Sequence, residues 1–182
     1  AAAMAFDSAR AVWDQAADMP EFAGDRLDRA VFPPPAFTDE ERAAQAKNVT
    51  EMATAQPSIA AVSLSYMSLL DQIGIKPDAA AGHSFGELSA LAAAGRIPST
   101  KLLVSARKRG EFMAEAASTQ AGAMIAVRSD ADTISALIDE TSGVVVANDN
   151  APNEVVIAGS VESIDAFAAK LKEAGMRSVR LP

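Results

Sequence analysis

The sequence contains no cysteine and one histidine, His83, among its 182 residues. Without cysteine, a disulfide framework, a thiolate metal site and a thiol nucleophile are all excluded. Aromatic residues are also scarce, at 5%, whereas 49% of the chain is apolar. An apolar share of this size, rich in alanine, is typical of closely packed helices around an ordinary core. The length fits one domain, or one domain with a small subdomain.

Positive charge is scarce as well, because 16 lysines and arginines face 24 acidic residues. The one dense basic triplet, residues 107–109, is too small for a nucleic-acid surface. The apolar runs are shorter than the roughly 18 residues that a membrane span needs. The first residues do not resemble a signal peptide either. We therefore expect a soluble cytoplasmic protein that binds neither nucleic acid nor a membrane.

The first third of the chain is expected to be helical. Residues 4–18 have the apolar spacing of a helix, and Thr38, followed by three acidic residues, is expected to cap another. A long helix is predicted to begin at Pro57 and to end at Gly74. We expect its buried face to consist of its large apolar residues, Ile59, Val62, Tyr66, Leu69, Leu70 and Ile73.

The middle of the chain carries the motif Gly82-His83-Ser84-Phe85-Gly86, which fits the pattern G-x-S-x-G. Residues 78–82 are predicted to form a short strand that enters this turn. Residues 86–94 are predicted to form a helix closed by Gly95, and Ser99 is expected to cap a further helix. Strand, sharp turn and helix are the context that makes the pattern meaningful.

The last third alternates between strand and helix. Strands are predicted at 122–127, 143–147, 154–158 and 176–181, with helices at 130–140 and 160–174, capped by Asp130 and Ser160. The order β-α-β-β-α-β is that of ferredoxin-like units. We therefore expect two parts, residues 1–119 and residues 120–182.

Ser84 is the candidate nucleophile. A serine at such a turn is held clear of its strand, and we expect Gly82 and Gly86 to let neighbouring backbone approach. The helix that follows places N–H groups, notably that of Phe85, where an oxyanion would develop. The competing interpretation is a glycine-rich turn whose serine merely caps a helix.

The base for this serine is not evident in the sequence. Serine is a poor nucleophile at its ordinary pKa unless a base takes its proton. His83 is adjacent to Ser84, and neighbouring side chains at a strand end point to opposite faces. We expect His83 to pack behind the turn, so that the base comes from elsewhere.

Three motifs together resemble one known family. The segment GHSFGELSALAAAG, preceded by QPSIAAVSLSYMSLLDQIGIKPDAAA, is similar to the malonyl-CoA:acyl carrier protein transacylase family, and especially to acyltransferase domains of iterative polyketide and polyunsaturated-fatty-acid synthases. RKRGEFMAEAA resembles the family's R-G-x-x-M helix, and VANDNAPNEVVIAGS its N-x-N-x-P segment. The resemblance covers about residues 50–160, the central portion of such a domain.

The resemblance implies an α/β-hydrolase-like core, incomplete in this chain, with an inserted ferredoxin-like subdomain. It implies a Ser–His dyad that takes a malonyl group from malonyl-CoA as an acyl-serine. The group then passes to the phosphopantetheine thiol of an acyl carrier protein, with no bound cofactor. The implied partners are a carrier domain, other domains of a multidomain synthase, or a second chain that completes the domain.

The resemblance also assigns roles to individual residues. Ser84 is the implied nucleophile, the Phe85 amide is one arm of the oxyanion hole, and Arg109 binds the malonyl carboxylate. A bidentate guanidinium suits that planar anion. The alternative for Arg109 is one more solvated arginine beside Arg107 and Lys108.

Four further residues are assigned to the acyl pocket or its surroundings, and each has a plain alternative. Gln56 lines the pocket or is an ordinary helix residue. Asn148 and Asn150 lie near the catalytic centre or occupy a turn between strands. Met113 forms a pocket wall or belongs to the core.

The chain also departs from the family pattern. The family's first strand and loop, which supply the second oxyanion-hole arm, have no counterpart here, nor does the segment with the catalytic histidine. Asn153 stands where the family commonly has glycine. Two other functions stay open: a serine hydrolase with the same turn, and a non-catalytic docking module.

Overall fold

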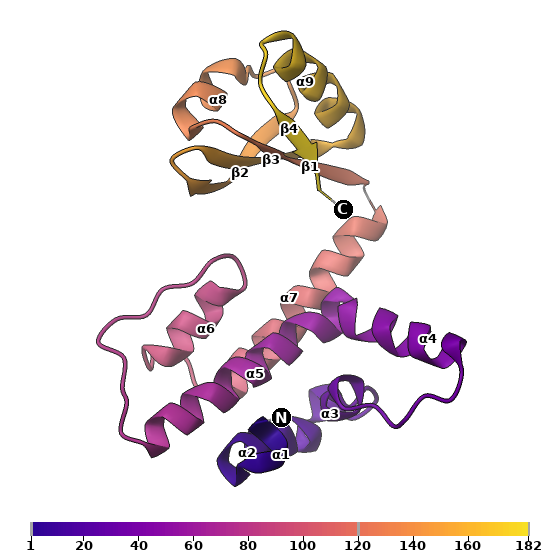
Figure 1. Cartoon of the computed structure of the whole chain (residues 1–182), viewed down its shortest axis with the longest axis vertical. Coiled ribbons are helices and arrows are strands. Elements are labelled where there is room, and N and C mark those ends of the chain that lie inside the picture. The colour runs from indigo at the N-terminus through magenta and orange to yellow at the C-terminus, as the bar shows by residue number, and fades with distance from the viewer. Residues whose placement is uncertain (1, 120, 182) are drawn as a thin grey trace. The chain divides into compact units, whose positions relative to one another are not determined.

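The computed structural model describes residues 2–119 and 121–181. The chain divides into two compact units, Ala1–Glu115 and Ala116–Pro182 (Figure 1). Throughout the described residues of the first unit the regular structure is helical, whereas the second unit contains a four-stranded sheet. Within those described ranges, no helix combines the length and the apolar character that crossing a bilayer requires.

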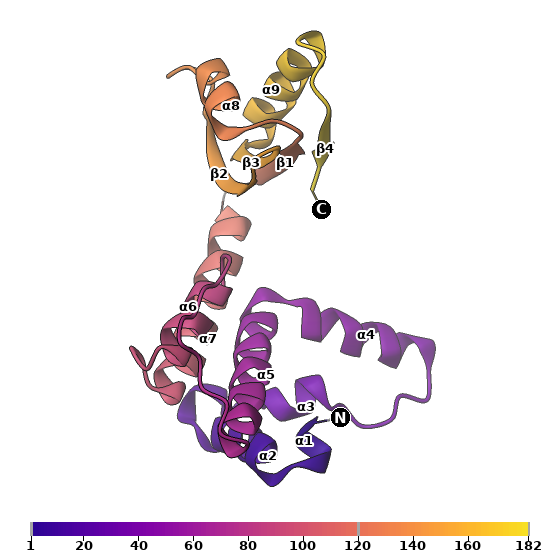
Figure 2. The ribbon, with the colours of Figure 1, turned by 60° about the vertical axis from the view of Figure 1, so that its left-hand side comes forward.

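The first unit is an assembly of helices joined by short turns and two longer loops. The helices are α1 (Ala2–Ala5), α2 (Asp7–Asp18), the 3-10 helix η1 (Pro20–Phe22), α3 (Leu27–Val31), α4 (Asp39–Thr50), α5 (Met52–Gln72) and α6 (Gly86–Ala93). Helix α7 (Ser99–Thr119) begins in this unit, and its last residues belong to the second. Helices α5 and α7 lie side by side in both views of the ribbon (Figures 1 and 2).

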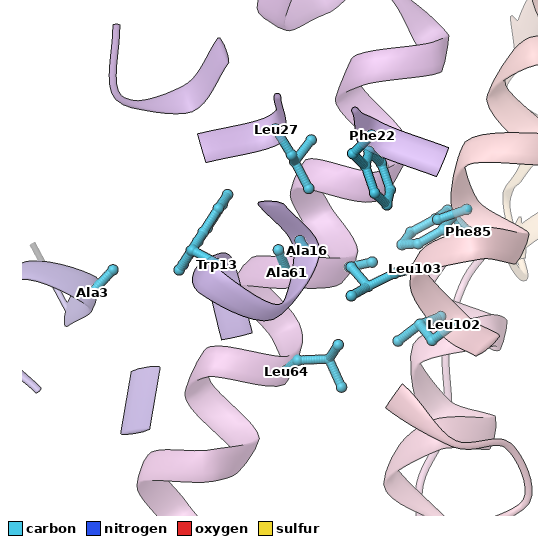
Figure 3. Close-up of a cluster of buried hydrophobic side chains, with 12 residues drawn as sticks. Ala3, Trp13, Ala16, Phe22, Leu27, Ala61, Leu64, Phe85, Leu102 and Leu103 are labelled. Carbon is cyan, nitrogen blue, oxygen red and sulfur yellow. The ribbon is translucent and has the colours of Figure 1, made fainter. Parts of the chain in front are cut away.

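The core of the first unit lies between α2, α5 and α7. Its buried side chains include Trp13 from α2, Leu64 from α5, and Leu102 and Leu103 from α7 (Figure 3). Phe85, from the serine turn, belongs to the same cluster and is 8% exposed. Because burying a phenylalanine is worth about 1.5–3 kcal/mol, this side chain ties the turn to the helical core.

The helix predicted over residues 4–18 is divided in two. Phe6 has an extended backbone, with φ of −131° and ψ of 125°, and stands between α1 and α2. The Arg10 guanidinium donates to the backbone carbonyls of Ala3 and Met4. These bonds satisfy carbonyls at the end of α1 that have no partner in a continuing helix, which accounts for the break.

The predicted helix ends are largely confirmed. Thr38 caps α4: its hydroxyl accepts from the Glu41 amide, and the Glu41 carboxylate accepts from the Thr38 amide, which makes a complete capping box. Gly74 and Gly95 follow α5 and α6 with φ of 76° and 67°. Ser99, however, is the first residue of α7 rather than its cap, because the helix already uses the Pro98 carbonyl.

The prediction for α5 is wrong in two respects. The helix begins at Met52, so Pro57 lies in its interior. Its large apolar residues also form the exposed face, since Ile59 is 52% and Ile73 71% exposed. The buried face is made of smaller residues, including Ala60, Ala61 and Ser65. Small residues let α2 approach so closely that the Ser65 hydroxyl donates to the Ala9 carbonyl at 3.1 Å.

The predicted strand over residues 78–82 is also wrong, because the structure has no strand there. A strand needs a neighbour for its backbone donors and acceptors, and none of the described residues of the first unit provides one. Instead, Asp78, Ala79 and Ala80 line a cleft of about 970 Å³ together with parts of α5 and α6.

The second unit follows the order β-α-β-β-α-β. Its elements are β1 (Gly122–Val127), α8 (Ala131–Leu137), β2 (Val144–Ala151), β3 (Glu154–Ser160), α9 (Val161–Glu173) and β4 (Ser178–Arg180). The sheet order is β2-β3-β1-β4, and every neighbouring pair is antiparallel. The pairs Ile125–Ile157 and Val127–Val155 point into the core under α8 and α9.

The predicted elements of the second unit are confirmed with changes at their ends. Asp130 and Ser160 cap α8 and α9 as expected. Helix α8 stops at Leu137, before the predicted end at residue 140, because the Asp139 carboxylate accepts from the Thr141 amide and hydroxyl in a turn. Strand β2 runs on to Ala151, beyond its predicted end.

Candidate active site

The serine turn is strained in the way that a nucleophile elbow requires. Ser84 has φ of 52°, which makes it the one non-glycine residue with positive φ among those described. A Cβ on Gly82 would collide with the carbonyl group of Gly86, so only glycine fits there. The expectation for Gly86 is wrong, because a Cβ at that position would meet open space. The close approach therefore depends on Gly82 alone.

Helix α6 starts directly after the serine. The amides of Gly86, Glu87 and Leu88 donate to the carbonyls of the residues three positions before each of them, at 2.9–3.1 Å. Phe85 already has helical backbone angles, with φ of −56° and ψ of −34°. The Phe85 amide therefore lies at a helix N-terminus, where a developing negative charge is stabilised. His83 is exposed, and its backbone carbonyl is the first acceptor of the helix.

Arg109 joins two of the predicted site residues. Its Nη2 donates to the Ser84 Oγ at 3.3 Å, and its Nη1 donates to the Gln56 Oε1 at 2.8 Å. Three elements thus meet at this point: α5, the serine turn and α7. The structure brings together Ser84, Arg109 and Gln56, which the sequence places 53 residues apart at the extremes.

The basic triplet at residues 107–109 separates into different roles. Burial opposes the charge of Arg107, but its hydrogen bonds to Glu111 and Asp25 outweigh burial and raise its pKa. Lys108 lies 3.9 Å from Glu111. Arg109 differs, since no carboxylate among the described residues lies within ion-pair distance of it. Its positive charge is held by neutral partners and is left uncompensated beside Ser84.

Gly110 sets the spacing between the two helices that carry the site. A Cβ there would collide with the backbone of Met52 and Ala53 at the start of α5. Glycine therefore lets α7 approach α5 one residue after Arg109, so that the Arg109 side chain reaches Gln56. The sequence motifs do not single out Gly110 or Met52, although a glycine inside a helix pattern commonly marks a close packing contact.

Met113 also belongs to this cluster. Its Sδ accepts from the Gln56 Nε2 at 3.1 Å, and the Met52 Sδ lies 3.9 Å from the same nitrogen. Gln56 itself is 4% exposed. Four predicted site residues are thus linked within the first unit, by contacts that run from Ser84 through Arg109 and Gln56 to Met113.

The asparagine pair lies in the second unit and belongs to β2 rather than to a turn. Asn148 pairs with Val156 of β3, and the register shifts on either side of residues 148 and 149. The Asn150 amide donates to the Glu154 carboxylate at 3.5 Å. The expectation of a turn is therefore wrong for both residues, and the role of Asn148 stays a prediction. In the described ranges, no three histidine or acidic side chains gather in a way that could hold a metal ion.

A serine with positive φ, placed before a helix N-terminus and beside an uncompensated arginine, defines a protein of the nucleophile-elbow class. The chain belongs to the acyl transferase domain family, whose pattern matches residues 3–181. This confirms the family resemblance. Its mixed helix and sheet fold matches that of solved acyltransferase domains.

Individual relatives include two curated proteins. The chain is 36% identical over 137 residues to the malonyl CoA-acyl carrier protein transacylase of Bacillus subtilis, which covers 72% of this chain and 43% of that protein. It is 34% identical over 160 residues to one chain of the polyunsaturated fatty acid synthase of Thraustochytrium, covering 86% of this chain and 6% of that protein. The chain thus spans less than half the length of either relative.

Two solved structures show the same likeness. The malonyl CoA-acyl carrier protein transacylase of Clostridium perfringens matches with a TM-score of 0.81 and 28% identity, over 97% of this chain and 53% of that one. The acyltransferase domain from the second module of the salinomycin polyketide synthase matches with a TM-score of 0.78 and 30% identity, over 98% and 39%.

Proposed function

We propose that this chain is the central part of an acyltransferase domain that moves a malonyl or related acyl group from coenzyme A to an acyl carrier protein. The observation that supports this most directly is the uncompensated Arg109 guanidinium, 3.3 Å from the Ser84 Oγ. A cation beside a nucleophile suits a substrate with a carboxylate close to its reacting carbonyl, and malonyl has this form. The family relationship points to the same reaction.

In the proposed mechanism, the Ser84 Oγ attacks the thioester carbonyl of malonyl-CoA. The developing oxyanion is stabilised by the Phe85 amide at the start of α6. Collapse of the intermediate breaks the carbon–sulfur bond, and coenzyme A leaves as its thiol. The carrier's phosphopantetheine thiol then attacks the acyl-serine and restores the Ser84 hydroxyl.

Arg109 holds the substrate during both steps. Its guanidinium has five N–H donors, of which one binds Gln56 and another binds Ser84. The malonyl carboxylate would take the donor on Ser84 and a free one beside it, as a planar anion does on a guanidinium. The Ser84 hydroxyl would then be released for attack while the donor carbonyl is held over it.

The proton acceptor is proposed to be a histidine outside this chain. His83 is the one histidine of the sequence and directly precedes Ser84. The family resemblance places the dyad histidine in a segment beyond these residues. We call the chain together with that histidine segment and the first strand of the family the complete domain.

We propose that residues 1–119 are part of an α/β-hydrolase-like subdomain and residues 120–182 a ferredoxin-like subdomain. The order β-α-β-β-α-β and the sheet order β2-β3-β1-β4 support the second assignment. For the first, support comes from the serine turn followed by α6. A cytoplasmic location is part of the proposal and rests on the cysteine-free composition.

The proposed partners are a carrier domain and other domains of a multidomain synthase, or a second chain that completes the domain. The relative from Thraustochytrium, of which this chain covers 6%, supports the multidomain setting. The formal charge of −8 gives no long-range attraction to an acidic carrier. Docking would therefore depend on local basic residues.

Transfer to a carrier separates this proposal from a hydrolase and from a docking module. The complete domain is mixed with malonyl-CoA and a phosphopantetheine-bearing carrier, and the carrier's intact mass is followed over time. We expect malonyl-carrier to form faster than free malonate. Malonate release without carrier loading would favour a hydrolase, and no product of either kind would favour a docking module.

A further inference from the structure

Gln56 is a buried amide with both of its ends engaged. Its Oε1 accepts from the Arg109 Nη1 at 2.8 Å, and its Nε2 donates to the Met113 Sδ at 3.1 Å. A guanidinium can only donate, so the carbonyl end of the amide must face Arg109. The amino end must then face the two thioethers, with the Met52 Sδ at 3.9 Å. The orientation of this amide is therefore fixed by its chemistry.

The helices reinforce that orientation. Because Gly110 lies against the backbone of Met52 and Ala53, α5 and α7 are in contact at the level of the amide. Gln56 follows Met52 by one helical turn, and Met113 follows Arg109 by one turn. Residues spaced by one turn lie on the same helix face. The pairs Met52–Gln56 and Arg109–Met113 thus face each other across the closest approach of the two helices.

We infer that Gln56 is a positioning residue: Met113 and Met52 hold its amide, and the amide aims the Arg109 guanidinium at the Ser84 Oγ. This rests on the proposed function for its consequence, because Arg109 is the group that would bind the acyl carboxylate. The Gln56 amide acts through Arg109 and does not touch the acyl group. The glutamine thereby sets the preference for a charged acyl donor.

A glutamine that contacts the acyl group would show a different pattern. Such a residue would affect every acyl donor, because the thioester carbonyl is common to all of them. A positioning residue affects only the donors that use Arg109. Its effect also disappears once Arg109 is gone, since the two substitutions then remove the same interaction.

The main test compares donors in the complete domain. Gln56→Leu and Met113→Leu are made alone and together with Arg109→Ala, and Ser84 acylation rates are measured with malonyl-CoA and acetyl-CoA. Met4→Leu, at a 72% exposed position on α1, is the matched control for a methionine substitution. Thermal unfolding of each variant is recorded alongside.

For Gln56→Leu, we expect malonyl loading to fall roughly ten- to a hundred-fold, the loss typical of a hydrogen bond to a charged group. Acetyl loading should stay within about three-fold. Met113→Leu should fall in the same direction by less, because a thioether is a weak acceptor. Gln56→Leu in the Arg109→Ala background should cost nothing more. Equal losses for both donors, or additive losses with Arg109→Ala, would overturn the inference.

A second measurement decides the inference even if the proposed function fails. If the unsubstituted complete domain takes up no acyl group from either donor, the proposed function is wrong. The guanidinium signals of Arg109 in 15N NMR spectra then report directly on its orientation. We expect its Nη groups to rotate slowly in the unsubstituted protein and faster in Gln56→Leu and Met113→Leu, with Met4→Leu unchanged. Unchanged Arg109 signals in Gln56→Leu would contradict the positioning role.

Discussion

Arg109 donates a hydrogen bond from Nη2 to the Ser84 Oγ at 3.3 Å, across 25 residues of sequence. The contact joins the start of α6 to the middle of α7, and Phe85 and Leu103 anchor these two elements in one core. A guanidinium in this position has no carboxylate partner among the described residues, unlike Arg107 two positions earlier. The charge at the site is therefore available to a ligand.

The first prediction concerns that charge. Arg109→Ala in the complete domain should lower malonyl loading of Ser84 by about 1.5–3 kcal/mol, since it removes a charge-assisted pair with the carboxylate. Acetyl loading should fall less or rise, because an uncharged acyl group does not need the cation. The measurement is the acylation rate with each donor. If both rates fell equally, Arg109 would serve only to hold the fold.

The second prediction concerns the contact between α5 and α7. Gly110→Ala should destabilise the chain by about 1–3 kcal/mol, because its Cβ would press on the Met52 backbone. Gly86→Ala is the matched control, since its Cβ would meet open space. That substitution should stabilise by roughly 0.5–1 kcal/mol through helix propensity. Chemical denaturation of both variants of the full chain measures the difference, and equal effects would contradict the close approach.

The third prediction concerns pH. The backbone and side-chain hydrogen bonds from Thr133 lower the pKa of Asp130 below its ordinary value. Because the folded pKa is the lower one, the stabilisation is fully present above the unfolded pKa of about 3.9. It is lost as pH falls through the folded pKa. Asp130→Asn keeps a capping side chain but removes the titration.

The measurement for Asp130 is the denaturation midpoint of the second unit between neutral and acidic pH, followed by the exchange of α8 amides. Asp130→Asn should show a smaller loss on acidification than the unsubstituted chain. The control is Asp132→Asn, which removes a charge from the same turn without touching the cap. A pH dependence that Asp130→Asn leaves unaltered would show that the cap does not contribute to it.

The second unit could be predicted closely from the sequence. Its strands carry alternating apolar residues such as Ile125 and Val127, and its helices begin at the capping residues Asp130 and Ser160. These patterns are local and refer to a core that the unit contains itself. The miss at the end of β2 came from the asparagines, which commonly favour turns but here extend a strand with shifted register.

The first unit could be predicted less well because its elements depend on distant neighbours. The large apolar residues of α5 suggested the buried face, but Ala60 and Ala61 take it because they admit α2 more closely. Residues 78–82 lack a pairing strand in the structure. The site was found through Ser84, Arg109, Gln56 and Met113, whereas Gly110 and Met52 act through packing and carry no chemical motif.

The fourth prediction is that the 182 residues alone are catalytically inactive. His83 directly precedes Ser84, and its backbone position is fixed by the start of α6. Loss of one oxyanion-hole donor typically costs about 100- to 1,000-fold, and loss of the base costs more. Purified chain should therefore form no acyl-serine and hydrolyse no thioester above background. Activity like that of an intact acyltransferase, abolished by His83→Ala, would contradict this.

The most direct test of the account is the mass of the complete domain after brief mixing with malonyl-CoA, followed by peptide mapping. The account predicts one added malonyl group, located on the peptide that contains Ser84 and absent from Ser84→Ala. Arg109→Ala should lower the malonyl adduct far more than the acetyl adduct formed from acetyl-CoA. A folded domain that carries no adduct, or an adduct on another residue, would contradict the account.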